Sequence, residues 1–322
     1  MARFILQRLS VAIVLLLVVS LLVFIGCEIL PGDVAQVALG QFATEDTVRA
    51  LRIEMGLDKP APVRYVTWLL GIVHGDWGNS ITTKTPVITM LSERMANTAI
   101  LAGATTIIAV PLALILGLLM AVKSGRAFDR GASVVVLGLS ATPEFLLGTL
   151  AVLLFAVKLR WLPAVAYLSS GADFGQTVRA LLLPVATLVI VVTAQIARMT
   201  RANIGNILQL PYIEMASLKG VPRPRVVAYH AMINAIGPIS NVVALNVAYL
   251  VSGIVIVETI FAYPGLARLM IDAVQARDLP VVQACAMIFC VTYVLLILLA
   301  DILAYAFDPR SGVQSGNGRA VH

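Results

Sequence analysis

Long apolar runs recur along the chain. Five of them contain no Asp, Glu, Lys or Arg, and they cover Ser10–Cys27, Met95–Val122, Ala180–Ala197, Val226–Val257 and Leu279–Ala300. A sixth run, Gly131–Val157, is interrupted by a single acid, Glu144. Each run is at least as long as a helix that crosses a bilayer, which needs roughly 17–25 residues. The pattern predicts six membrane-spanning helices and an all-α integral membrane protein.

The segment between the first two runs alternates polar and apolar residues. Thr44 is a suitable N-cap, acids occupy the next two positions, and Gly56 can end a helix, so a short helix is expected over 44–55. A second helix is expected over Pro60–Val73, with one apolar face formed by Val63, Val66 and Leu70. We therefore expect residues 31–97 to form a helical cap outside the membrane, packed on the spans.

Composition narrows the class of protein. Of 322 residues, 60% are hydrophobic and 12% are charged, against roughly 25% charged in soluble domains. The net charge of +6 comes without a basic stretch interleaved with aromatics, so an anionic lipid leaflet explains it better than nucleic acid. Neither the three cysteines nor the three histidines have metal-ligand spacing. The sequence predicts a lipid-embedded protein without a metal or nucleic-acid site.

The distribution of basic residues predicts the orientation. A cytoplasmic N-terminus would leave 12 of the 23 Lys and Arg residues inside and 5 in the short outer loops, as the positive-inside rule favours. We expect both termini in the cytoplasm. The expected divisions are a first helix over 1–30, the cap over 31–97, a transmembrane core over 98–305 and a cytoplasmic tail over 306–322.

No catalytic group of residues emerges from the sequence. The nearest approach to a phosphate-binding loop is Gly117 followed by Lys123-Ser124, but Val122 stands where the second glycine is needed. The chain is therefore expected to be non-enzymatic and to hold no cofactor. Glu144 follows Pro143 within a predicted span, where an acid is costly. It could line a solute pathway, or it could pair with a backbone donor that the proline frees, and both alternatives stay open.

Two loops suggest mechanical roles. In the cytoplasmic segment near 207–236, Pro211 can open a short helix and Gly220 can close it, with Lys219 in the last turn; Pro222 and Pro224 then restart a second helix. On the outer side, Tyr263-Pro264-Gly265 breaks the chain before an amphipathic stretch that contains Leu266, Leu269, Met270 and Val274. We expect a projecting knob inside, and outside a short helix that lies on the mouth of the bundle and gates a pathway.

The knob carries a family resemblance. Residues 214–220, Glu-Met-Ala-Ser-Leu-Lys-Gly, resemble the E-A-A-x-x-x-G signature of permease subunits in bacterial ABC importers. Similarity to the first permease of dipeptide and oligopeptide importers, a group that also handles nickel, glutathione and opines, extends over nearly the whole chain. Further matching segments are Leu30–Asp33, Met55–Asp58, Gly75–Gly78, Arg198–Arg201, His230–Ala235, Val257–Phe261, Tyr263–Leu266, Arg277–Asp278, Pro280–Gln283 and Asp308–Arg310.

The resemblance implies an assembly. Members of this family pair with a second, similar permease, two cytoplasmic ATPase subunits that bind ATP and magnesium, and an extracytoplasmic solute-binding protein. It implies that the residues presented to the ATPase are Tyr212, Glu214, Ala216, Lys219 and Gly220.

Secondary transporters and membrane-embedded enzymes are two alternative classes of apolar membrane protein. A secondary transporter would show an inverted repeat and midplane ion ligands, and a membrane-embedded enzyme would show a polar catalytic cluster; neither feature is found in the sequence.

Overall fold

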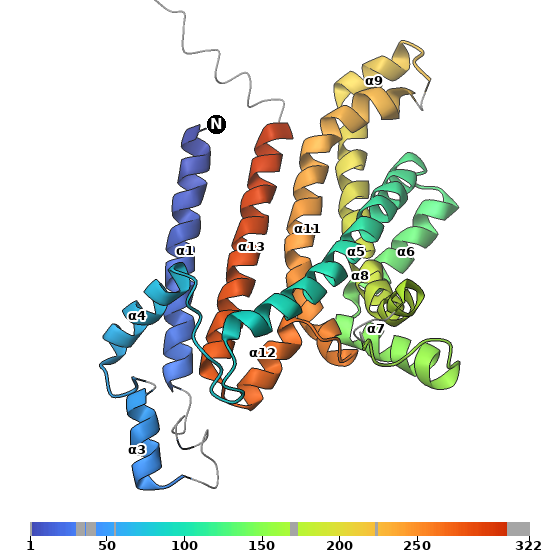
Figure 1. Ribbon diagram of the computed structural model, residues 1–322. Coiled ribbons are helices and arrows are strands. Elements are labelled where there is room, and N and C mark those ends of the chain that lie inside the picture. The colour runs from blue at the N-terminus through green and yellow to red at the C-terminus, as the bar shows by residue number, and fades with distance from the viewer. Residues whose placement is uncertain are drawn as a thin grey trace, which may run out of the picture. The chain divides into compact units, whose positions relative to one another are not determined.

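The computed structural model describes residues 2–29, 36, 43–54, 56–167, 173–222 and 225–307. The described part is helical, and its only β pairing is one isolated bridge between Asn79 and Pro86. Five long helices and eight shorter helical segments follow one another in the described part of the chain (Figure 1). Their bounds are α1 Ala2–Ile29, α3 Glu45–Glu54, α4 Ala61–Val73, α5 Val87–Val122, α6 Ala127–Ala141, α7 Glu144–Ala151, η2 Val152–Lys158, α8 Phe174–Leu208, α9 Pro211–Leu218, η3 Val226–Ala231, α11 Met232–Ile260, α12 Leu266–Gln275 and α13 Leu279–Phe307.

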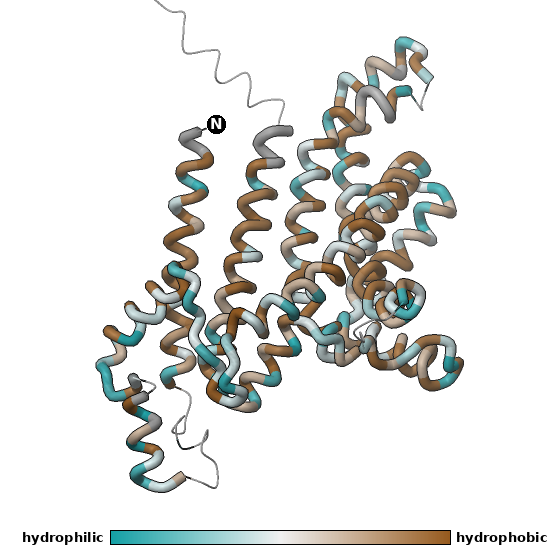
Figure 2. Tube along the Cα trace, in the orientation of Figure 1, coloured by the Kyte–Doolittle hydropathy of each residue, from teal (hydrophilic) through white to brown (hydrophobic). Residues whose placement is uncertain are grey.

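The predicted spans correspond to helices that are long and apolar enough to cross a membrane. Among the described residues, α1, α5, α8, α11 and α13 each qualify alone. Figure 2 shows the hydrophobic colouring that runs along most of α1 and α13. The sixth predicted span corresponds to α6 and α7–η2, which qualify only as a pair. The all-α membrane fold expected from the sequence is confirmed.

This sixth span is not a straight helix. Its two halves meet at an angle of 99°, at the break formed by Thr142 and Pro143. Proline cannot donate a backbone hydrogen bond and restricts the residue before it to an extended conformation, and Thr142 accordingly has ψ near 129°. Glu144, expected within this span, is the first residue of α7 and lies directly after the break.

The chain divides into two compact units, which are described separately. Unit 1 consists of residues 1–99 and 264–294, and unit 2 consists of residues 100–263 and 295–322. This division differs from the predicted core of 98–305, because α12 and the first half of α13 pack with the beginning of α5. Leu266 and Leu269 of α12 share a buried cluster with Val87 and Leu91 of α5.

In unit 1, α4 packs on α1 through an aromatic cluster. The hydroxyls of Ser20 and Tyr65 are 2.8 Å apart. The Phe24 ring lies 5.4 Å from that of Tyr65 and 6.0 Å from that of Trp68, between ring centroids. Both predicted cap helices are present as α3 and α4. The apolar face predicted for α4 is not the packed one, because its three residues are about half exposed: Val63 49%, Val66 53% and Leu70 53%.

The amphipathic α12 is also part of unit 1, and most of its predicted apolar face is buried. Leu266 and Leu269 are buried, whereas Val274 is 48% exposed and Ala273 takes its place in the cluster. Asp278, next to α12, is 3% exposed and accepts hydrogen bonds from the Ser80 hydroxyl and from the backbone N–H groups of Ile81 and Thr82. These bonds fasten the loop that precedes α5 to the turn between α12 and α13.

Unit 2 has its core between the long helices. α8 and α11 lie side by side (Figure 1), and α6 and α7 pack against them. A Cβ on Gly117 of α5 would lie 2.7 Å from the carbonyl oxygen of Ala197 and from the Cβ of Thr200, both in α8. Glycine therefore allows α5 and α8 to approach closely, as small residues do between membrane helices.

Candidate functional site

The predicted cytoplasmic knob forms a capped short helix. α9 begins at Pro211 and is followed by a turn at Lys219 and Gly220. Gly220 has φ +77°, a left-handed conformation that favours glycine, and the N–H of Val221 donates to the carbonyl of Ala216 at 3.2 Å. The start and end predicted for this helix are therefore confirmed. Lys219 lies just past the last helical residue rather than in the last turn.

α9 is anchored by one buried side chain. Ile213 is 3% exposed and belongs to a cluster with Ala121 at the end of α5, Ile204 and Ile207 at the end of α8, and Ala235 at the start of α11. Figure 1 shows α9 at the shared end of these helices in unit 2. Ile213 was not predicted as an anchor, because Leu210, Tyr212 and Met215 beside it are also apolar or aromatic and the local sequence does not distinguish it. A displacement of α9 would act on three long helices at once.

The other residues of α9 divide between two faces. Tyr212, Glu214 and Lys219 are exposed, as a contact surface for another protein requires. Ala216 is half-buried and packs on the Ile213 cluster. The methyl group of Ala216 therefore contacts the helices of unit 2.

An ion pair between a partly exposed arginine and a buried carboxylate lies near the same end of unit 2. The Arg201 guanidinium of α8 donates two hydrogen bonds to the Asp129 carboxylate of α6. Nε lies 2.5 Å from Oδ1, and Nη2 lies 2.8 Å from Oδ2. Asp129 is 2% exposed and also accepts a hydrogen bond from the N–H of Gly125. This pair was not predicted as a site, because Arg201 was noted only within a matching segment and Asp129 was not noted at all. It ties α6 to α8 in fixed geometry.

Glu144 is half-buried and faces α11. A Cβ added to Gly253 would lie 2.7 Å from one carboxylate oxygen of Glu144, so the glycine leaves the space that this carboxylate occupies. Pro143, which precedes Glu144, supplies the break between α6 and α7. Neither fact decides between the two roles that the sequence left open for Glu144.

The three predicted gate residues differ in their environments. Tyr263 is fully buried in the core of unit 2, and its N–H donates to the carbonyl of Glu258 at 2.9 Å. Burial raises the pKa of the Tyr263 hydroxyl well above its usual range, and the charge of Glu258 adds to this effect. In unit 1, the Pro264 carbonyl accepts a hydrogen bond from Asn97 at 2.8 Å, and Gly265 precedes α12. In this structure Tyr263 is thus a packed core residue, whereas Pro264 and Gly265 form the connection to α12.

The described residues contain no group of three or more His, Cys, Asp or Glu side chains that could hold a metal ion. Two segments used in the resemblance, Leu30–Asp33 and Asp308–Arg310, lie outside the described residues, as do the side chain of His230 and most of the predicted tail. What the described geometry defines is a multi-pass helical membrane protein with a short helix anchored at the shared end of three long helices.

Comparisons with known proteins identify the family. Residues 113–313 match the family described as binding-protein-dependent transport system inner membrane component, and residues 1–102 match its N-terminal companion. A protein of Sinorhizobium fredii named as a peptide ABC transporter permease is 36% identical over 96% of this chain and 99% of the relative. A glutathione transport system permease protein of Pectobacterium atrosepticum is 37% identical over 96% of this chain and 98% of the relative. The chain belongs to this family of inner-membrane transport components, as the resemblance indicated.

Proposed function

We propose that this chain is the permease subunit of an ATP-driven importer for peptides or similar small solutes, and that it forms half of the translocation pathway. The similarity to permeases named for peptides and glutathione, over 96% of the chain, carries the proposal. ATP and magnesium would bind to two separate cytoplasmic ATPase subunits, so this chain would be non-catalytic and free of cofactors. A second, homologous permease and an extracytoplasmic solute-binding protein would complete the assembly.

We propose that α9 couples this chain to an ATPase. Tyr212 is 44% exposed and Leu218 is 75% exposed, so α9 offers an apolar surface to a partner. Glu214, in the first turn, could accept a hydrogen bond from the ATPase. Because Ile213 anchors the same helix to the ends of α5, α8 and α11, a push on α9 would reach the bundle rather than bend a loose loop.

Transport by reconstituted liposomes tests the function. The chain would be assembled with its partner permease, both ATPases and the binding protein, and uptake of labelled peptides would be followed with and without ATP. Uptake should need both ATP and the binding protein. Transport by the chain without ATPases, driven by an ion gradient, would instead support a secondary transporter.

The proposed orientation places both termini and α9 in the cytoplasm and the cap outside. It is tested by replacing Ala50, exposed in α3, with cysteine after the native cysteines have been changed to serine. A membrane-impermeant maleimide should label Ala50→Cys from the outside. Leu218→Cys on α9 is the matched control and should react only after the membrane has been opened. The reverse pattern of labelling would refute the orientation.

A further inference from the structure

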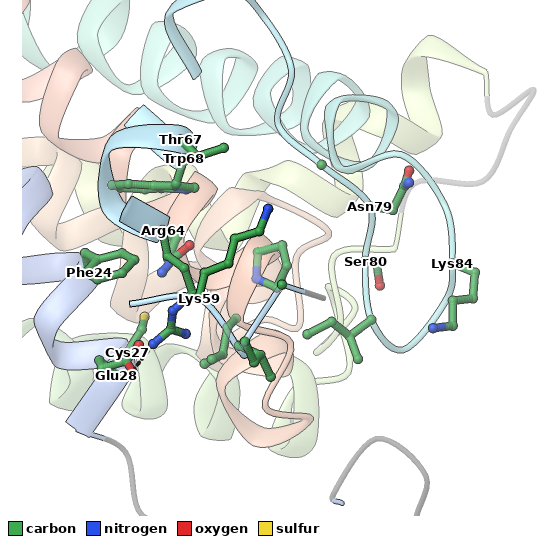
Figure 3. A pocket seen from close by; sticks show the side chains of 17 residues that line it. Phe24, Cys27, Glu28, Lys59, Arg64, Thr67, Trp68, Asn79, Ser80 and Lys84 are labelled. Carbon is green, nitrogen blue, oxygen red and sulfur yellow. Dashed lines mark hydrogen bonds and ion pairs between the residues drawn. The ribbon is translucent and has the colours of Figure 1, made fainter. Parts of the chain in front are cut away.

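Unit 1 contains a cavity of about 700 Å3 that plays no part in the roles proposed above. It is lined by the C-terminal end of α1, the segment that leads into α4, residues 78–84 and the beginning of α13 (Figure 3). Phe24, Leu57 and Trp68 give it apolar walls, whereas Asn79 and Gln283 are polar. A ligand with both a polar and an apolar part would suit these surroundings.

Positive charge predominates around the cavity. Lys59, Arg64 and Lys84 line it, against one acid, Glu28. Arg64 pairs with Glu28, but its Nε is buried without a hydrogen-bond partner among the described atoms. The Lys59 and Lys84 ammonium groups form no ion pair within the described part of the chain. Figure 3 shows Lys84 across the cavity from the Arg64–Glu28 pair. The site therefore has uncompensated positive charge and an unused donor, which suit an anion.

The surroundings of the cavity point to a lipid as the source of this anion. α1 is a span whose apolar window is only 11% buried, and Leu21, Leu22 and Ile25, next to the cavity residues of α1, are exposed at 43%, 61% and 40%. An exposed apolar strip on a membrane-spanning helix is suited to contact with hydrocarbon. Tyr and Trp concentrate at membrane–water interfaces, and here Trp68 lines the cavity with Tyr65 beside it.

We propose that this cavity binds the phosphate headgroup of an anionic phospholipid whose acyl chains lie along the exposed strip of α1. The phosphate would accept a hydrogen bond from Arg64 Nε and would be paired with the Lys59 and Lys84 ammonium groups. A free phosphate would satisfy the same charges but would leave the apolar strip unused.

Native mass spectrometry of the assembled importer in detergent tests the proposal. The complex would be titrated with phosphatidylglycerol, and with phosphatidylcholine as the zwitterionic comparison. Lys59→Gln and Lys84→Gln should each weaken binding of phosphatidylglycerol about fivefold, because each removes one basic group near the phosphate. Lys158→Gln, which removes an exposed ammonium from η2 in unit 2, is the matched control and should leave binding unchanged.

A second variant separates a built site from general surface charge. Thr67→Phe adds a ring to the cavity wall without a change of charge, and it too should weaken phosphatidylglycerol binding. Wild-type lipid binding in Lys59→Gln and Lys84→Gln, or equal binding of the two lipids, would overturn the proposal. Displacement of the lipid by inorganic phosphate would assign the site to the free anion, and displacement by a transported peptide would assign it to solute. Native mass spectrometry measures bound lipid and does not require transport. A failure of the lipid proposal can therefore be distinguished from a failure of the proposed peptide import.

Discussion

Substitution of Gly220 tests whether the shape of α9 controls coupling. The residue has φ +77°, and a Cβ there would meet no heavy atom within 4 Å, so the cost of a side chain is conformational rather than steric. The left-handed conformation costs an L-residue about 1–2 kcal/mol, and more for a β-branched one. A cost of this size changes the population of the native turn roughly 5- to 30-fold. An eight-residue helix has little stability of its own to offset the loss.

The expected result is a graded series. In liposomes that carry the assembled importer, Gly220→Asn should couple nearly as well as wild type, because asparagine tolerates this conformation. Gly220→Ala should be intermediate, and Gly220→Val should abolish both uptake and solute-stimulated ATP hydrolysis. Solute binding by the separate binding protein should be unaffected throughout.

Gly75→Val supplies a matched control for the backbone cost. Gly75 follows the end of α4 in unit 1, has φ +82° and also has open space around a Cβ position. Its substitution should lower stability by a similar amount yet leave the ratio of uptake to ATP hydrolysis unchanged. Tight coupling in Gly220→Val at equal assembly, or equal uncoupling in both variants, would show that α9 is not the coupling element.

Three further sets of substitutions test the packing. Gly117→Ala should destabilise the chain by about 1–3 kcal/mol in thermal unfolding, because its Cβ would lie 2.7 Å from atoms of α8. Gly103→Ala in the same helix is the control and should be neutral or stabilising. Similar effects of the two substitutions would contradict the close contact between α5 and α8. Asp129→Ala and Arg201→Ala should each lower the free energy of unfolding by about 1–3 kcal/mol. The double variant should be no less stable than either single variant, and additive losses of stability would mean that the two side chains do not interact. Asp278→Ala should speed amide hydrogen exchange in the loop that Asp278 holds, and an unchanged rate would show that other contacts fix that loop.

Five of the six predicted spans follow from the uncharged runs, because each such run must be buried in lipid. Both ends of α9 were predictable because Pro211 and Gly220 have local conformational requirements. The sequence could not predict the 99° break at Pro143. A proline marks an interruption, but the angle depends on which neighbours the two halves contact. The anchor Ile213 was missed for the same reason, since its burial depends on α5, α8 and α11 meeting at one end.

The cap shows where a rule for soluble proteins fails. Its predicted apolar face on α4, with Val66 as an example, is about half exposed, whereas the packed side uses Tyr65 and Trp68. In water an exposed apolar stripe would be unfavourable. Beside a membrane it can contact lipid, so apolar periodicity identifies the helix without identifying its packed side. The polar loop residues that Asp278 holds are separated from it by nearly 200 positions, and no local pattern reveals such a bond.

Within unit 2, continuous contacts lead from α9 to Glu144. The Ile213 cluster joins α9 to α8 and α11, and α11 in turn contacts α7, where Gly253 leaves room for the Glu144 carboxylate. Close-packed helices transmit displacement with little compression, so α8 and α11 would move with α9 as a body. The break at Pro143 lies at the far end of this path and lacks a continuous helical backbone. Glu144 lies directly beside this break, so uptake in Glu144 variants tests whether a displacement of α9 reaches α7.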